Sequence, residues 1–256
     1  MTGYVTPPVA NGGAGTHPAL NPEGMCAMDD VTLTLVDVNP KMVDAWRAVF
    51  DGEYGVAVVR GSLLDQRADA WVSPTNARAM MTGGVDALVR AHLGPGIQAR
   101  VRRAVTSRWG DAMPLGAAAC APTGRLLPSY LIATPTMHGP ADNVSATMNV
   151  ALACAAALQA ARTQNAVAPG SIRTVAMPGL GAGTGCVPPA VCADLMYAAW
   201  RLFEGRSFEG LHDLREALEN ELGDLGPVAP TPAVAYHGPR PAVLPTPYHG
   251  HRRASA

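Results

Sequence analysis

Short apolar runs alternate with longer amphipathic segments along the middle of the chain. Most of these runs are four to eight residues long and rich in valine, leucine and isoleucine, as is typical of buried strands. They lie at residues 31–38, 56–61, 69–74, 116–121, 130–137 and 172–178. The segments that predict helices lie at residues 40–50, 85–93, 97–105, 144–163, 189–203 and 210–222. Strands separated by helices predict a layered α/β domain with a largely parallel sheet.

The two ends of the chain lack this alternation. Residues 1–28 are rich in Gly, Pro, Ala and Asn, and residues 226–256 are dense in proline with a loose Tyr-His-Gly repeat. Such compositions are typical of disordered or extended segments. We therefore expect one folded domain over residues 29–225, between two disordered tails.

Composition and charge narrow the classes of function. The 256 residues are 48% hydrophobic, enough for a full core, and the net charge of -1 gives no global electrostatic case for nucleic acid or a membrane surface. Arginines make residues 90–108 locally basic; a solvated helix face is the default interpretation, and RNA contact is the minority one. The sequence thus predicts that any anionic ligand is bound by a few groups at its site and not by the overall charge of the protein.

The cysteines and the apolar runs indicate in which cellular compartment the protein is expected. Five cysteines include no C-x-x-C pair and no zinc-ligand spacing, so reduced thiols and no metal are expected. No apolar run reaches membrane-spanning length, and the first residues lack a secretory signal pattern. We expect a cytoplasmic protein without membrane contact.

Four glycines crowd the junction between the strand at 172–178 and the helix at 189–203. The sequence there is "PGLGAGTGCVPP", which contains neither a Walker A motif nor G-x-G-x-x-G. Glycines at such a junction let backbone N–H groups converge on an anion beside a helix N-terminus. A tight turn needs only one or two glycines, so we favour an anion site over a simple turn.

A second loop, "SPTNARAMMTGGVDALVR", follows the strand at 69–74. Taken alone, Asn76 is typical of an Asx turn, and Asp86 is a carboxylate favoured by the helix dipole. Together with the pair Gly83 and Gly84 they suggest chemistry, since an asparagine can hold sugar hydroxyls and a carboxylate can orient or deprotonate a water. The two loops together favour a ligand that combines ribose with a diphosphate.

Four segments in order then resemble a known family. "LVDVNPKMVDAW", "DAWVSPTNARAMMTGGVD", "YLIATPTM" and "PGLGAGTGCVPP" are similar to the macro domain, an ADP-ribose-binding module, and most of all to its phage- and bacterial-type branch. The resemblance spans about residues 31–203. It implies a three-layer α/β/α sandwich with a mixed, largely parallel central sheet, no cofactor, and ADP-ribose or an ADP-ribosylated substrate as partner of a monomer.

The resemblance also assigns roles to residues. Asn76 matches the asparagine that holds the distal ribose, and Asp86 matches the aspartate that positions or activates water in hydrolytic members; these two are the catalytic candidates. The residues implied to bind the ligand are Ser62, Asn76, Gly83, Gly84, Val85, Gly179, Leu180, Gly181, Ala182, Gly183, Thr184 and Gly185.

The chain departs from the family pattern at two places. Ser62 stands where many members have an aspartate for the adenine amino group, with Asp65 as an alternative partner, and Thr184-Gly185 replace the usual aromatic of the second loop. Three hypotheses therefore stand: a hydrolase of ADP-ribosyl linkages or ADP-ribose derivatives, a non-catalytic module that binds ADP-ribose, nucleotides or RNA, and a structural scaffold with proline-rich tails.

Overall fold

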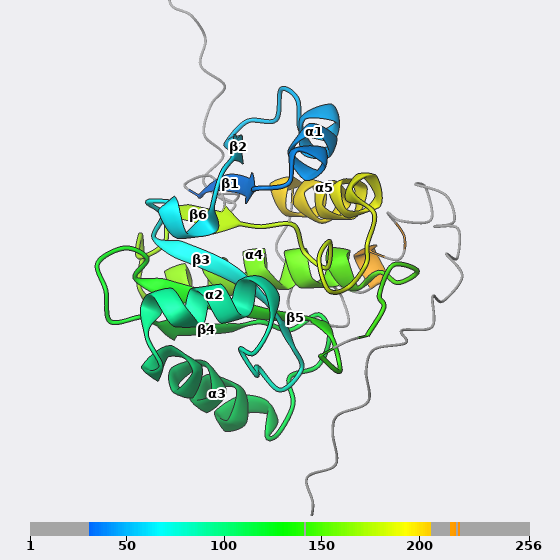
Figure 1. Ribbon diagram of the computed structural model, residues 1–256. Helices are drawn as coiled ribbons and strands as arrows, with labels where there is room; N and C mark the ends of the chain where they lie inside the picture. The colour runs from blue at the N-terminus through cyan, green and yellow to red at the C-terminus, as the bar shows by residue number, and fades with distance from the viewer. Residues whose placement is uncertain (1–30, 141, 206–215, 219, 221–256) are drawn as a thin grey trace, which may run out of the picture.

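A six-stranded sheet forms the centre of the computed structural model, which describes residues 31–140, 142–205, 216–218 and 220 (Figure 1). Its strands are β1 (Thr32–Asp37), β2 (Val56–Arg60), β3 (Ala70–Asn76), β4 (Ala119–Pro122), β5 (Tyr130–Met137) and β6 (Thr174–Met177). The order across the sheet is β2-β1-β6-β3-β5-β4. Only the β4–β5 pair is antiparallel within these described strands, so the predicted mixed, largely parallel sheet is confirmed.

Helices cover both faces of the sheet. They are α1 (Pro40–Val49), α2 (Gly84–Leu93), α3 (Gly96–Trp109), α4 (Asn149–Val167) and α5 (Pro189–Gly205). Helices α1, α4 and α5 share one hydrophobic core with the sheet, and α2 and α3 share a second core on the other face. The predicted three-layer α/β/α sandwich is therefore confirmed.

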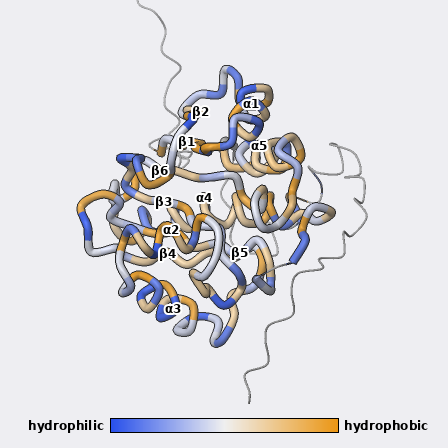
Figure 2. The backbone as a smooth tube through the Cα atoms, in the orientation of Figure 1, coloured by the Kyte–Doolittle hydropathy of each residue, from blue (hydrophilic) through white to orange (hydrophobic). Residues whose placement is uncertain are grey.

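The hydrophobic pattern of each element explains which face it covers. On α3, Ile97, Val101 and Val105 are fully buried at a spacing of four residues, which gives the helix a single apolar stripe. Figure 2 shows hydrophobic and hydrophilic stretches following one another along α3. On β3, Ala70 and Val72 enter the α4 and α5 core while Trp71 enters the α2 and α3 core, as the two-residue period of a strand requires.

Several element boundaries differ from the sequence predictions by a few residues, and two of these differences concern the site. Helix α4 begins at Asn149 rather than at 144, because Val144 donates its N–H to Gly185 O (3.0 Å) and is thereby tied to the neighbouring loop. Strand β3 continues past the predicted end at Pro74 to Asn76, with a register shift against β5 at its last two residues.

The remaining sequence predictions fall partly outside the described residues. Residues 216–218 and 220 are helical, within the predicted helix at 210–222, and the side chains of Ala217 and Leu218 are buried. The predicted tails at 1–28 and 226–256, and with them the domain bounds 29–225, lie outside what is described. No helix among the described residues is long and apolar enough to cross a membrane.

Candidate functional site

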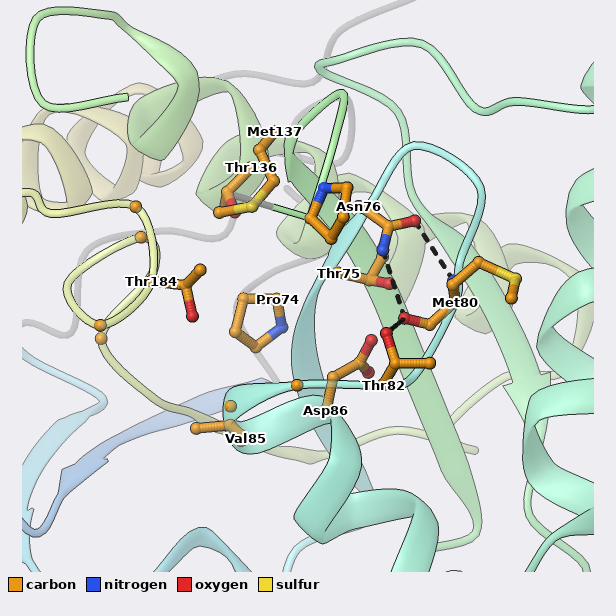
Figure 3. Close-up of a pocket in the computed structure, with 17 residues that line it drawn as sticks. Pro74, Thr75, Asn76, Met80, Thr82, Val85, Asp86, Thr136, Met137 and Thr184 are labelled. Carbon is orange, nitrogen blue, oxygen red and sulfur yellow. Dashed lines mark hydrogen bonds between the residues drawn. The ribbon is translucent and has the colours of Figure 1, made fainter. Parts of the chain in front are cut away.

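A pocket of about 320 Å³ opens where β3, β5 and β6 end (Figure 3). The carboxyl ends of neighbouring parallel strands meet at one edge of a sheet, and ligands of open α/β sheets bind there. The predicted site residues that line the pocket are Asn76, Gly83, Gly84, Val85, Asp86, Gly179, Gly181, Gly183, Thr184 and Gly185. The structure therefore brings both predicted loops to one cavity.

Three residues predicted to bind the ligand do not line this pocket. Leu180 is fully buried in the larger core, and Ala182 packs against that core from the second loop. Ser62 begins a short 3-10 helix (Leu63–Asp65) after β2, where its Oγ accepts the N–H of Leu64 at 3.1 Å. The serine therefore acts as a helix cap in this structure.

The pocket also contains residues that the sequence reasoning did not single out. They are Pro74, Thr75, Met80, Thr82, Thr136, Met137 and Pro140. Four of them, Pro74, Thr75, Thr136 and Met137, lie near the carboxyl ends of β3 and β5. The two threonines are polar residues in otherwise largely apolar strands. Polar residues at the carboxyl ends of two neighbouring strands were the signal available in the sequence.

The first loop delivers the N-terminus of α2 to the pocket. Gly83 is the N-cap and no side chain caps the helix, so the first amides of α2 have no acceptor among the described residues. Gly84 has a φ of +57°, a left-handed conformation that favours glycine. Unpaired amides at a helix start form a positive site, which suits an anion.

Packing explains three of the four glycines in the second loop. A Cβ on Gly185 would lie 2.7 Å from Gly181 O, one on Gly181 would lie 3.2 Å from Val187, and one on Gly179 would lie 3.1 Å from Asp37. At Gly183, in contrast, a Cβ would meet no atom within 4 Å. The glycine content of this loop therefore arises mainly from close packing, and only Gly183 faces open space.

Hydrogen bonds hold the second loop in a curved shape. Cys186 donates its N–H to Gly183 O (3.0 Å), and Val187 donates its N–H to Gly181 O (3.1 Å). The amides of residues 180–185 have no acceptor among the described residues. A curved run of unpaired amides is a known type of anion-binding concavity.

The two loops approach each other across the pocket. A Cβ built on Gly84 would lie 3.6 Å from Thr184 Oγ1, so the start of α2 and the tip of the second loop are in near contact. Figure 3 shows Thr184 on one side of the cavity and Val85 and Asp86 on the other. Residues with unpaired amides from both loops thus line one small volume.

Asp86 is the buried carboxylate of the site. It lies in the first turn of α2 with only 3% of its surface exposed, and its Oδ1 accepts a hydrogen bond of 2.6 Å from Ser73 Oγ. Burial raises the pKa of Asp86 to about 6, and this rise is partly opposed by the Ser73 and Thr75 hydroxyls and by the charge of Arg90. The carboxylate is thus mostly ionised at neutral pH and able to accept a proton.

Asn76 holds its own loop together. Its Oδ1 accepts the N–H groups of Arg78 (3.1 Å) and Met80 (3.2 Å), and its Nδ2 donates to Met80 O at 3.2 Å. The Asx-turn interpretation is therefore realised, and a single N–H of the carboxamide stays available for a ligand.

The site offers groups for anion binding and for proton transfer. Among the described residues, no three His, Cys, Asp or Glu side chains come together in a way that could hold a metal ion. The available groups are unpaired amides, one buried carboxylate and several hydroxyls.

Comparison with known proteins gives a consistent result. The family model described as "Macro domain" matches residues 72–196. An uncharacterized protein of Aquifex aeolicus is 33% identical over 174 residues, which cover 66% of this chain and 98% of that protein. A macro domain-containing protein of Streptomyces griseus is 35% identical over 89 residues, 34% of this chain and 50% of that protein.

Solved structures show the same similarity at lower identity. The Oceanobacillus iheyensis macrodomain with ADP is 18% identical over 64% of this chain and 88% of that chain, with a TM-score of 0.46. The macrodomain of Thermus aquaticus DarG is 25% identical over 57% of this chain and 91% of that chain, also with a TM-score of 0.46.

Proposed function

Because this chain belongs to the macro domain family, we propose that its pocket binds ADP-ribose or a related nucleotide diphosphate. The observation that supports this most is that residues with unpaired amides from both loops line one cavity: those at the start of α2, and Gly181, Gly183, Thr184 and Gly185 of the second loop. The diphosphate lies between the two loops and accepts hydrogen bonds from both. Such binding needs no charged side chain.

We propose further that the protein hydrolyses ADP-ribosyl linkages or ADP-ribose derivatives, with Asp86 as the general base. The oxygen of a water bonds to the anomeric carbon of the distal ribose and its proton passes to Asp86. The bond from that carbon to the acceptor atom breaks, and the acceptor takes up a proton. A pKa of about 6 suits this role, because the carboxylate is ionised at neutral pH yet basic enough to take the proton.

Asn76 contributes in two ways under this proposal. It shapes the first loop through its three hydrogen bonds, and its remaining N–H donates to a hydroxyl of the distal ribose. Its oxygen already accepts two hydrogen bonds, so orientation of the sugar rests on donation by the amide alone.

Selection of the base is expected to be weak. The Ser62 oxygen caps the short helix after β2, which leaves it a poor acceptor for an adenine amino group. Comparing ADP-ribose with its inosine analogue by calorimetry tests this expectation. Affinities within about fivefold would support it, because a single neutral hydrogen bond contributes about 1 kcal/mol.

Binding and catalysis are tested separately. A thermal-shift panel of ADP-ribose, ADP, ATP, NAD and a short RNA is expected to show the largest shift with ADP-ribose. A ligand at 100 times its Kd adds about 2.7 kcal/mol to stability. Asp86→Ala is expected to keep ADP-ribose binding and to lose turnover of an ADP-ribosylated substrate. Unchanged turnover by the folded variant would refute the role of Asp86, and no shift at millimolar ADP-ribose would refute binding.

A non-catalytic reader of ADP-ribose is the second candidate. The commitment of the Asn76 carboxamide to its own loop favours it, as does the lack of an aromatic residue at Thr184-Gly185. Calorimetry that detects ADP-ribose binding while no ADP-ribosylated substrate is turned over at any pH would establish this candidate instead of the hydrolase.

We also propose that the protein acts as a monomer in the cytoplasm and belongs to the phage- and bacterial-type branch. The free state of all four cysteines in the described residues fits a reducing compartment. The bacterial relatives fit the branch. Light scattering and cell fractionation test the first two statements.

A further inference from the structure

Two hydroxyl side chains replace apolar ones on the α2 face of β3. Residues two apart on a strand share a face, so Ser73 and Thr75 lie on the same face as Trp71, which packs in the α2 and α3 core. Both hydroxyl residues are buried, with 0% and 4% of their surfaces exposed. They therefore meet the first turn of α2, where Asp86 lies.

Ser73 lies behind Asp86, on the side away from the cavity. Its Oγ donates a 2.6 Å hydrogen bond to Asp86 Oδ1, and Asp86 lines the pocket whereas Ser73 does not. A charge-assisted hydrogen bond between two buried groups fixes the orientation of a carboxylate. Asp86 Oδ2 accepts no hydrogen bond of standard geometry within the described part of the chain, and it remains for the cavity.

Thr75 also lines this cavity, and its buried hydroxyl has no hydrogen-bond partner among the described residues. Its Oγ1 is nevertheless near enough to lower the pKa of Asp86. A buried hydroxyl without a partner costs about 1–3 kcal/mol by mutational measures. Figure 3 shows the Asp86 carboxylate directed toward Thr75, with Thr82 beside it. Such a hydroxyl next to a carboxylate oxygen offers two polar partners, the minimum for an ordered water.

We propose that Ser73 is the positioning residue that orients Asp86, and that Thr75 Oγ1 and Asp86 Oδ2 together hold the water that attacks the ligand. This inference rests on the proposed hydrolysis and assigns its water site to two residues of β3. Thr75 donates to the water oxygen, the water donates one hydrogen to Asp86 Oδ2, and the second lone pair of the oxygen faces the pocket.

Thr134 on the adjacent strand β5 shows what a purely structural threonine looks like in this sheet. It is also fully buried, but its Oγ1 lies within hydrogen-bond distance of Ala153 O (3.1 Å) and Ala117 O (3.2 Å). Thr134 does not line the pocket. Thr134→Val is therefore a matched control for Thr75→Val, because each removes one buried hydroxyl from a central strand.

Kinetics and thermal unfolding test the part assigned to Thr75. Thr75→Val is expected to lower kcat about tenfold or more while ADP-ribose affinity stays within threefold, because one hydrogen bond to the nucleophile is lost. Its Tm is expected to equal or exceed that of the wild type. Thr134→Val is expected to lower the Tm and to leave kcat unchanged.

A pH titration tests the part assigned to Ser73 without relying on activity. In Ser73→Ala, the midpoint of the Asp86 carboxyl carbon signal in NMR is expected to rise by about one pH unit or more, because a hydrogen bond to the ionised form is lost. The midpoint of the acid limb in the pH profile of kcat/KM is expected to rise by the same amount. Ser73→Thr, which keeps the hydroxyl, is expected to restore both toward the wild type.

The outcomes separate this inference from the proposed function. If Asp86→Ala is inactive but Thr75→Val turns over at the wild-type rate, the water site is wrong and the hydrolase stands. An unmoved Asp86 midpoint in Ser73→Ala overturns the positioning role. Absence of turnover by the wild type overturns both the hydrolase and the water site, and the NMR titration still decides Ser73.

Discussion

Replacement of Asp86 by asparagine is expected to stabilise the fold in a pH-dependent way. The unfolded chain ionises this carboxyl at its ordinary pKa of 3.8, whereas burial raises its pKa to about 6 in the folded protein. Between these values the folded state binds more protons than the unfolded state, so its stability falls as pH rises. Below pH 3.8 the side chain is neutral in both states and contributes no pH dependence.

The size of the effect follows from the same two values. A difference of one unit between the folded and unfolded pKa corresponds to about 1.36 kcal/mol. Ionisation of Asp86 therefore lowers the free energy of unfolding by about 3 kcal/mol at and above pH 7. Asn at this position keeps an oxygen that can accept from Ser73 Oγ and carries no charge to desolvate. The stability advantage of Asp86→Asn over wild type should therefore grow by about 2.4 kcal/mol between pH 4 and pH 7, because the unfolded chain is already partly ionised at pH 4.

Urea unfolding followed by tryptophan fluorescence at pH 4, 5, 6 and 7 measures this difference, since Trp46 and Trp71 are buried. Subtracting the unfolding free energy of the wild type from that of the variant at each pH cancels the contributions of the other titrating groups. Asp111→Asn is the control, because Asp111 is exposed and stays in water in both states. A difference between Asp86→Asn and wild type that stays constant from pH 4 to pH 7 within about 0.5 kcal/mol, roughly the error of such measurements, would refute the reasoning.

Three further predictions concern the loops and the reaction. Gly185→Ala is expected to destabilise the protein by about 1–3 kcal/mol, because its Cβ would lie 2.7 Å from Gly181 O, whereas Gly183→Ala should change stability by less than about 0.5 kcal/mol; chemical denaturation of both variants compares them. The kcat/KM for an ADP-ribosylated substrate should fall about tenfold per pH unit below pH 6, as Asp86 becomes protonated, and a flat profile down to pH 4.5 would contradict a catalytic carboxylate. Asn76→Ala should weaken ADP-ribose binding in calorimetry and lower stability by about 1–3 kcal/mol, since three hydrogen bonds of the loop are lost; unchanged affinity would contradict the role of this loop.

The layered fold was predictable because its elements carry strong periodic signals. The strands are short apolar runs and α3 has a clear apolar stripe, so local pattern and tertiary packing agree. The start of α4 was not predictable in this way. Residues 144–148 are compatible with helix, but the Val144 N–H bonds to the second loop, and this tertiary contact overrides local propensity.

Within the site, the two loops were predictable from glycines and motif order, but the β3 hydroxyls were not. The predicted strand ended at Pro74, a residue that lacks the N–H that a central strand uses. In the structure β3 continues to Asn76, which places Ser73 and Thr75 on a buried face. In the sequence, a hydroxyl residue near the end of a strand is typical of the start of a loop. In the structure, the same hydroxyl lies on a buried face and needs a hydrogen-bond partner. The role of these hydroxyls follows only from their neighbour in space, Asp86, which is 11 to 13 positions away in the sequence.

Several locally unfavourable features lie within this one pocket. A buried carboxylate, a threonine hydroxyl without a partner and unpaired amides of two loops all belong to residues that line it. Each feature lowers stability on its own, and a substitution at Asp86 or Thr75 would remove it without disturbing the sheet. Strain and unsatisfied polar groups that persist together at one place are typical of a site selected for binding or catalysis rather than for stability. Variants such as Asp86→Asn and Thr75→Val are therefore expected to gain stability where they lose function, whatever family the chain belongs to.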